Sequence, residues 1–377
     1  MRYLSAGTLR PLLAAIAGLA SATAFAATAP ATDIPARQEV LTFTSLTLSD
    51  QQFLTGDQGG TEVLLGGVLS LPPGEGRVPV VLLQHGSGGM GANITYWQRQ
   101  FNQAGIATFA VDGFSGRGIT STATNQAQLG RLNFVLDDYR AGALLARHPR
   151  IDTGKIILMG FSRGGQASLY AAMERFDKRW KSQDFQFAGY LSFYPDCSIS
   201  FREQDRVVAK PLRVYHGLAD NYDPYSRCEG YLATLKQQGA DLGVHTYPHA
   251  EHGFDSPYVW SPVVVAKGSQ TVRECRITEN AKGELINQQT GKVFSYQDSC
   301  VVLGPKVGPD AEATRQATRD VLAAVKAIVK LGSRSTSALA EEGAGPHRGS
   351  SGSPGGTGTH PGGESGPLVE KAPNIPV

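Results

Sequence analysis

The chain lacks any marked charge bias, and this limits the partners that can be expected. Lys and Arg number 35 and Asp and Glu 33, which gives a formal net charge of +2, and charged residues make up only 18% of the sequence. Because no basic stripe is present, we expect no nucleic-acid partner. No internal repeat is evident either. The 377 residues are ample for one domain of roughly 250 to 300 residues with a single core.

The N-terminus has the features of a secretory signal peptide, which we place at residues 1–26. Arg2 and Arg10 precede a short apolar run that ends in the pattern Ala-Phe-Ala at residues 24–26. The run is short for a membrane anchor, which needs about 20 apolar residues. We therefore expect cleavage after Ala26, no membrane span in the mature protein, and a periplasmic or secreted location.

Cysteine is scarce. The four cysteines are Cys197, Cys228, Cys275 and Cys300, and none belongs to a C-x-x-C pair. In an exported protein, an even number of cysteines favours disulfides over a metal site. Four cysteines permit three pairings, of which we favour Cys197–Cys228 and Cys275–Cys300, because each closes a loop of moderate length.

Apolar runs alternate with helical segments along most of the chain. The expected strands are 39–48, 62–71, 78–84, 106–112, 155–159, 188–194, 211–216 and 243–247. The expected helices are 93–103, 126–147, 165–175, 225–238 and 310–331. Near-continuous apolar strands separated by helices indicate an α/β fold, with a mostly parallel, doubly wound sheet covered by helices on both faces. We predict one domain over residues 38–332.

Three segments depart from this alternation. Residues 256–304 alternate polar and apolar side chains around Gly283 and Gly291, and we expect a small β-hairpin excursion there, stapled by Cys275–Cys300. Residues 333–377 are rich in Gly, Ser, Pro, Thr and Glu, so they cannot bury enough apolar surface to order themselves, and we expect a disordered tail. Residues 27–37 are expected to form a flexible leader.

The most informative motif is Gly160-Phe161-Ser162-Arg163-Gly164-Gly165, which lies between an apolar strand and a helical run. A serine in such a turn has strained backbone angles, and the glycines two positions away on each side give the backbone the necessary freedom. The hydroxyl then stands clear of the sheet at the positive end of a helix. A plain Gly-rich turn would fit the motif alone, but the strand before it and the helix after it favour Ser162 as a nucleophile.

A serine nucleophile needs a base and a carboxylate that orients this base. Asp220 follows the strand at 211–216, and His252 follows the strand at 243–247, so both lie where loops converge at the carboxyl edge of the sheet. We prefer Asp220 to Asp223, which precedes a proline and is expected to cap the next helix. We prefer His252 to His249, because the glycine after His252 lets the loop turn sharply.

The same stretch offers an alternative reading as a metal site. His245, His249, Glu251 and His252 have spacings that suggest zinc ligands. The alternation of side chains along an extended strand and the lack of a second ligand set disfavour this reading. We therefore expect no metal ion and no organic cofactor.

An oxyanion hole is expected beside the nucleophile. One donor is the backbone N–H of Arg163, the residue after the serine. The second donor is expected in the loop after the strand at 78–84, from Gly86 or Ser87, where neighbouring glycines let an amide turn inward. A plain Gly-rich turn is the alternative for this loop.

These motifs carry a family resemblance. HGSGG (85–89), DGFSGRG (112–118), GFSRGG (160–165), HGLAD (216–220) and HAEHGF (249–254) resemble the serial motifs of the α/β-hydrolase superfamily, and most closely those of the dienelactone hydrolase family. The resemblance spans roughly residues 61–331. It implies an α/β-hydrolase fold with Ser162 as nucleophile, Asp220 as acid and His252 as base. Typical members have a cysteine at the nucleophile position, so the serine points to a general esterase rather than a dienelactone hydrolase.

Arginines near the motifs are candidates for substrate binding. Arg117 and Arg163 are suited to a substrate carboxylate, which guanidinium groups bind in a bidentate manner, and His85 is a further candidate. The alternative for each arginine is a structural ion pair or a position in solvent. No large insertion separates Ser162 from Asp220, so we expect an open site that the excursion overhangs.

Together these features predict an exported serine hydrolase that cleaves a small-molecule or polymeric carboxylic ester through an acyl-enzyme intermediate. A serine peptidase of the same superfamily is one alternative, although the chain has no room for the propeller domain of prolyl-oligopeptidase-like enzymes. A non-catalytic binding protein is the other alternative, and the intact Ser, Asp and His set argues against it.

Overall fold

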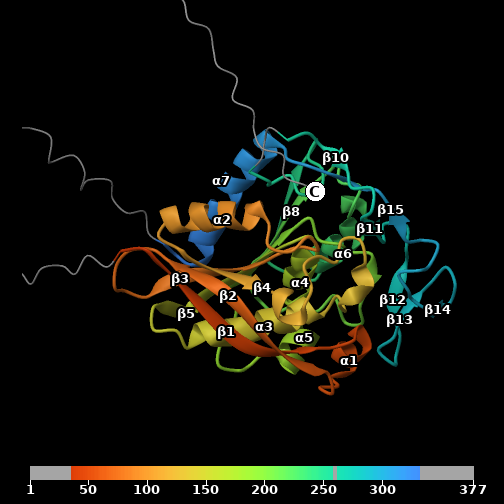
Figure 1. Cartoon of the computed structure of the whole chain (residues 1–377), viewed down its shortest axis with the longest axis horizontal. Coiled ribbons are helices and arrows are strands. Elements are labelled where there is room, and N and C mark those ends of the chain that lie inside the picture. Colours follow the sequence, from red (N-terminus) through yellow and green to blue (C-terminus); the bar gives the residue numbers. More distant parts are fainter. Residues whose placement is uncertain (1–34, 258–260, 332–377) are drawn as a thin grey trace, which may run out of the picture. The chain divides into compact units, whose positions relative to one another are not determined.

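The computed structural model describes residues 35–257 and 261–331. The predicted signal peptide, the predicted tail and most of the predicted leader lie outside these ranges. The described residues form an eight-stranded sheet (Figure 1). In spatial order its strands are β1 (Arg37–Thr47), β2 (Thr61–Leu71), β4 (Ala107–Asp112), β3 (Val78–Gln84), β5 (Ile151–Phe161), β6 (Gly189–Phe193), β8 (Leu212–Gly217) and β9 (Leu242–Tyr247).

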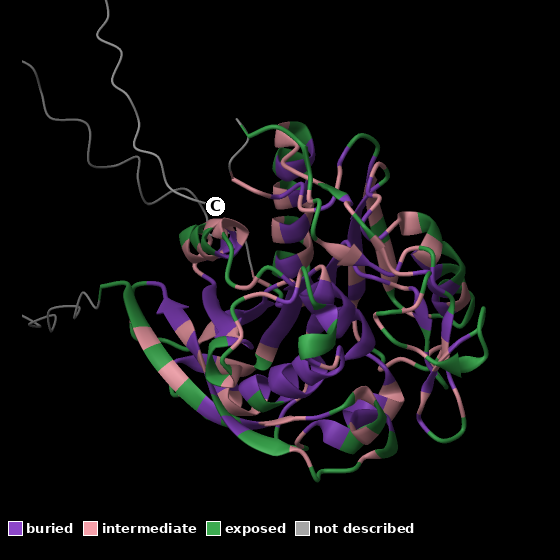
Figure 2. Cartoon of the chain, turned by 45° about the vertical axis from the view of Figure 1, so that its right-hand side comes forward, coloured by how far each residue is buried: buried purple, intermediate pink, exposed green. Residues whose placement is uncertain are grey.

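The sheet is antiparallel at one edge and parallel elsewhere. β1 pairs antiparallel with β2, and β2 pairs antiparallel with β4. Every pair from β4 to β9 is parallel. Parallel strands buried on both faces are nearly continuous runs of apolar residues, as in β3, where six of the seven residues are buried. Figure 2 shows the buried residues gathered in these central strands.

Helices cover both faces of the sheet. They are α1 (Asp50–Thr55), α2 (Ala92–Gln103), α3 (Asn133–Ala146), α4 (Arg163–Tyr170), α5 (Glu174–Trp180), α6 (Tyr225–Gln237) and α7 (Ala311–Ile328). α2 and α7 bury their apolar residues in one core, and α3 to α6 bury theirs in a second core across the sheet (Figure 1). This arrangement confirms the predicted α/β fold with a mostly parallel, doubly wound sheet.

Two predicted helices differ from those observed. The helix expected over 126–147 begins only at Asn133, after a short 3-10 turn, η2 (Gln126–Gln128). The side chain of Asn133 bonds both backbone groups of Leu48, so a tertiary contact sets this start. The helix expected over 165–175 splits into α4 and α5, because Met173 is extended and forms a β-bridge with Val207. Both differences come from contacts distant in sequence.

The excursion has more strands than the single hairpin that the sequence suggested. Its strands, with β16 just after it, are β10 (Val264–Val265), β11 (Gln270–Thr271), β12 (Ile277–Glu279), β13 (Leu285–Asn287), β14 (Lys292–Val293), β15 (Val302–Leu303) and β16 (Lys306–Val307). β12, β13 and β14 form a meander, which β7 (Ile199–Ser200) extends by pairing with β12. The predicted pairs Cys197–Cys228 and Cys275–Cys300 are both present.

Within the described ranges, no helix is both long enough and apolar enough to cross a membrane.

The two disulfides are expected to stabilise the fold by similar amounts. They close loops with sequence separations of 31 and 25, so the loss of either pair is expected to lower the free energy of unfolding by about 3 kcal/mol. The measurement is urea unfolding of Cys275→Ala/Cys300→Ala beside Cys197→Ala/Cys228→Ala. A double variant as stable as the parent protein would contradict a stabilising role for that disulfide.

Candidate active site

Ser162 lies in a strained turn between β5 and α4. Its φ of 54° and ψ of −115° belong to a region that side-chain-bearing residues rarely adopt. The backbone on either side is too close to its neighbours for larger residues: a Cβ at Gly164 would lie 2.2 Å from the carbonyl oxygen of Gln84, and one at Gly160 would lie 1.9 Å from that of Gly164. The turn therefore requires these glycines and presents the serine hydroxyl at the start of α4.

Three predicted residues meet at the carboxyl edge of the sheet. The Nε2 atom of His252 lies 2.9 Å from the Oγ atom of Ser162, and its Nδ1 atom lies 2.8 Å from the Oδ2 atom of Asp220. The other oxygen of Asp220 accepts backbone N–H groups from Tyr222 and Asp223 at 2.8 and 3.0 Å. In this geometry the carboxylate fixes the imidazole, and the imidazole faces the hydroxyl.

The ring of His252 is fixed by neighbours that the sequence analysis did not identify. Tyr194 and Tyr222 each place a ring centroid 4.6 Å from that of His252. The Tyr194 hydroxyl donates to Asp255 at 2.6 Å. The backbone carbonyl of His252 accepts the N–H of Gly308, so the chain after the excursion also holds this loop. Tyr194 directly follows β6. Its position at the end of a strand could have marked it in the sequence as a residue of the site.

The charges of the site raise the pKa of His252. Burial by itself lowers the pKa of His252, but the carboxylate of Asp220, together with Asp223 and Asp255, outweighs burial and raises the pKa above its usual value of 6.5. Burial also raises the pKa of Asp220, but its contact with His252 lowers the pKa below the usual 3.8. Asp220 thus stays ionised and stabilises the imidazolium that forms when His252 accepts a proton.

Asp223 does not cap the next helix, contrary to our expectation. Pro224 holds the cap position of α6, and no side chain caps this helix. Asp223 is buried instead, with its Oδ2 atom 3.9 Å from the Nδ1 atom of His252. Burial, together with the charge of Asp196, raises its pKa well above 3.8. Asp223 is therefore a second carboxyl group beside the histidine, and its environment favours the neutral form.

The predicted oxyanion loop lies against the nucleophile. A Cβ at Gly86 would lie 3.1 Å from the Cβ atom of Ser162, so the loop backbone passes directly over the turn. Ser87 and Arg163 line a small cavity together with Ser162, whereas Gly86 does not line it. The loop is held by Ser87, whose hydroxyl donates to Gln126 at 3.1 Å. Of the two candidate residues, Ser87 is thus the one that lines the cavity with Ser162.

Two candidate substrate-binding residues lie in the protein interior. Arg117 forms a bidentate ion pair with Asp137 at 2.7 and 2.9 Å, and its side chain is only 3% exposed. The structure thus contains the ion pair that we gave as the alternative to substrate binding by Arg117. His85 is buried against Phe114 and Phe134, and burial lowers its pKa to about 4. The substrate-binding interpretation of Arg117 and His85 is therefore corrected, because Arg117 is held by Asp137 and His85 is packed between two phenyl rings.

The four residues that we considered as possible zinc ligands have different surroundings. His245 stacks on Tyr215 and lies 3.5 Å from Asp320, and Glu251 pairs with Lys306. His249 is exposed. In the described part of the chain, no three His, Cys, Asp or Glu side chains are grouped to hold a metal ion.

The cavity that contains Ser162, called the nucleophile pocket below, has walls that the sequence analysis did not predict. Its remaining lining residues are Gln126, Arg131, Asp196, Tyr222, Asp223, Gln270, Thr271 and Val272. Arg131 and Asp196 form a buried ion pair within it. The excursion contributes residues 270–272, so it borders the nucleophile as expected. The side chain of Arg163 also lines this pocket, and its Nη2 atom is held by the carbonyl groups of Gln126 and Leu129.

The electrostatics of the site predict an elevated pKa for His252. We expect the imidazole to titrate above pH 6.5 and, in Asp220→Asn, below it, because burial remains while the stabilising charge is lost. The measurement is NMR titration of the ring protons, with the His252 signals assigned from their absence in His252→Gln. An unchanged pKa in Asp220→Asn would contradict this account of the site.

The chain is similar to several solved structures. Among solved structures, a putative dienelactone hydrolase from Klebsiella pneumoniae is 14% identical, with 76% of this chain and 98% of that chain covered and a TM-score of 0.47. A dienelactone hydrolase-like promiscuous phosphotriesterase from metagenomic libraries is 14% identical, with 78% and 98% covered and a TM-score of 0.48. An esterase from Thermogutta terrifontis is 17% identical, with 51% and 80% covered and a TM-score of 0.41.

No curated protein sequence matches the chain. The model of the dienelactone hydrolase family matches residues 65–272, which is more than half of the 377 residues. This match contains the strained serine turn, the aspartate and histidine loops and the oxyanion loop. The chain therefore belongs to the dienelactone hydrolase family.

Proposed function

We propose that this protein is an exported serine esterase that cleaves carboxylic esters through an acyl-enzyme intermediate. His252 removes the proton of Ser162 as the serine oxygen attacks the ester carbonyl, and Asp220 holds the imidazolium. His252 then protonates the departing alcohol. In the second half of the reaction His252 activates a water molecule, which attacks the acyl group and frees Ser162.

The observation that carries this proposal is the continuous contact from carboxylate to hydroxyl. Asp220, His252 and Ser162 are joined by separations of 2.8 and 2.9 Å, in a site where His252 is only 6% exposed. Such a preformed contact lets the hydroxyl lose its proton as it attacks. We assign the amides of Arg163 and Ser87 to the oxyanion hole, where each such donor is typically worth about 3 to 4 kcal/mol.

The small volume beside the serine supports a short acyl or alcohol group at this point. The nucleophile pocket leaves about 10 Å³, which is room for little more than one water molecule. Its wall includes Arg163, the only one of our three candidate substrate-binding residues that lines a cavity described here. The serine in place of the usual family cysteine favours a general ester over a dienelactone as substrate.

Export is the second part of the proposal. The N-terminal charge and apolar pattern supports secretion, and the two disulfides are of the kind that persists in oxidising compartments. A periplasmic or secreted location follows. Fractionation of the producing cells, with N-terminal sequencing to find cleavage after Ala26, tests this part.

The serine mechanism predicts activity that depends on one hydroxyl. The mature protein is expected to hydrolyse p-nitrophenyl esters, fastest for short acyl chains in a series from acetate to palmitate. Ser162→Ala is expected to fall to background, a loss on the order of a millionfold in kcat. If a correctly folded protein turns over none of these esters, the esterase proposal is wrong, and a peptidase or a non-catalytic binding protein becomes the better explanation.

The same substitution, Asp to Asn, is expected to have a large effect on kcat at Asp220 and a small one at Asp223. Asp220→Asn is expected to lower kcat by about ten thousandfold, because it removes the charge and favours the wrong imidazole tautomer. Asp223→Asn is expected to stay within about fivefold of the parent, because burial shifts this carboxyl group toward its neutral form, which an amide resembles. The comparison uses p-nitrophenyl acetate at pH 7. An equal loss in both variants would overturn the assignment of Asp220 as the orienting acid.

A further inference from the structure

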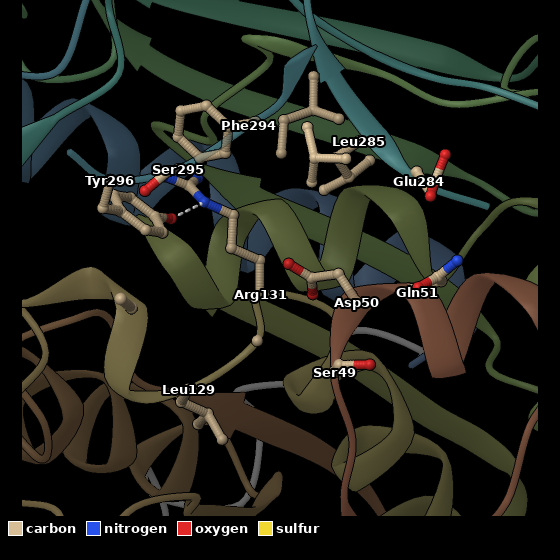
Figure 3. A pocket seen from close by; sticks show the side chains of 14 residues that line it. Ser49, Asp50, Gln51, Leu129, Arg131, Glu284, Leu285, Phe294, Ser295 and Tyr296 are labelled. Carbon is tan, nitrogen blue, oxygen red and sulfur yellow. Dashed lines mark hydrogen bonds between the residues drawn. The ribbon is translucent and has the colours of Figure 1, made fainter. Parts of the chain in front are cut away.

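A second and larger cavity adjoins the nucleophile pocket across one side chain. It has a volume of about 400 Å³ and lies between α1, the loop after η2 and the excursion. Arg131 lines both cavities. Its guanidinium bonds Asp196 in the nucleophile pocket and the hydroxyl of Tyr296 in the larger cavity (Figure 3). We call the larger cavity the excursion groove.

The walls of the excursion groove lie outside residues 65–272, the part of the chain that the family model matches. One wall is Ser49 with the first turn of α1, which precedes the family match at residues 65–272. The facing wall is the meander of β13 and β14 with the turn that follows, beyond the end of the match. Only the floor, which includes Leu129 and Arg131, lies within it. Figure 3 shows Asp50 and Phe294 on opposite sides of Arg131.

The lining of the groove is suited to an uncharged apolar group. Leu129, Leu285 and Phe294 face it, and the ring of Phe294 contacts that of Tyr296 edge-on with centroids 5.1 Å apart. A volume of about 400 Å³ lies within the 300 to 1,000 Å³ typical of small-molecule sites. A ring-bearing or branched substituent fits such a space, whereas the nucleophile pocket admits only a very small one.

The charged groups of the groove already have partners. Asp50 accepts the backbone N–H of Leu132 at 3.1 Å, and Glu284 accepts the side-chain amide of Asn280 at 2.7 Å. Arg131 is engaged by Asp196 and Tyr296. Since an ionic ligand would have to compete with these contacts, the groove selects against charge.

We propose that the excursion groove binds the larger half of the ester, an uncharged aromatic or branched apolar group, while the smaller half stays beside Ser162. This inference rests on the proposed esterase function. The scissile bond then lies at Ser162, and Arg131 lies between the two cavities. The walls that set substrate preference then lie before and after residues 65–272, the part of the chain that the family model matches.

The test fills the groove from its exposed rim. Val293 lines the groove and is 57% exposed, so Val293→Trp adds bulk there without disturbing the core. Leu303 lies on β15, is 58% exposed and does not line the groove, so Leu303→Trp is the matched control. Phe294→Ala removes an apolar wall and is the second test variant. Each protein is assayed on ethyl acetate, 2-naphthyl acetate and methyl 2-naphthoate.

The expected result separates large from small substrates. Val293→Trp and Phe294→Ala are each expected to lower kcat/KM at least tenfold on a naphthyl-bearing ester, since even one methylene in an apolar pocket is worth tenfold or more. Activity on ethyl acetate is expected to stay within twofold, as is that of Leu303→Trp on all three esters. The two naphthyl esters show which half of the substrate enters the groove. Unchanged kcat/KM on both naphthyl esters in both test variants would overturn the proposal, as would an equal loss on ethyl acetate.

A binding measurement keeps this test independent of the proposed chemistry. Equilibrium dialysis of 2-naphthyl acetate and methyl 2-naphthoate against Ser162→Ala is expected to give binding that weakens at least tenfold when Val293→Trp is added, but not when Leu303→Trp is added. Ester turnover that survives in Ser162→Ala would refute the proposed function while leaving the groove to be judged by this binding. Equal binding with and without Val293→Trp would refute the groove even if the esterase reaction is established.

Discussion

The close approach of backbone around Ser162 is the constraint on which the rest of the structure depends. The start of α4 is packed against the carboxyl ends of β3 and β6 so tightly that a Cβ at Gly165 would lie 2.2 Å from the carbonyl oxygen of Phe193, much as one at Gly164 would meet Gln84. The Ser162 N–H donates to that same Phe193 carbonyl. Only glycines allow the helix to begin this close to the sheet. The strained φ of the serine is maintained by the surrounding packing, which fixes the hydroxyl before any substrate arrives.

Around this turn, the site combines two carboxyl groups whose pKa values are shifted in opposite directions. Asp220 accepts two backbone N–H groups and contacts His252, which lowers its pKa, whereas burial and the charge of Asp196 raise the pKa of Asp223. Two ionised carboxylates this close in a buried site would repel each other. The difference in environment gives the histidine one partner that orients it and a second carboxyl group that lines the pocket.

The excursion links stability to substrate selection. Its disulfide, Cys275–Cys300, ties together the segment whose residues 270–272 line the nucleophile pocket and whose meander forms a wall of the groove. The second disulfide joins Cys197, next to Asp196, to α6. Both covalent links therefore hold loops that carry lining residues. A small meander cannot bury much apolar surface by itself, so covalent closure compensates for the weak core.

The sequence by itself determined the mostly parallel sheet and pointed to Ser162, Asp220 and His252, which the structure brings together. It could do so because apolar runs and glycine requirements are local properties of the chain. It also suggested the two disulfide pairs. The tertiary structure alone decided that Asp223 lies beside His252, that Arg117 is held by Asp137, and that Arg131 separates two cavities. It also decided where α3 begins, through the bonds of Asn133 to Leu48. These features depend on which distant segments are in contact, and no periodicity or motif within one segment predicts such a contact.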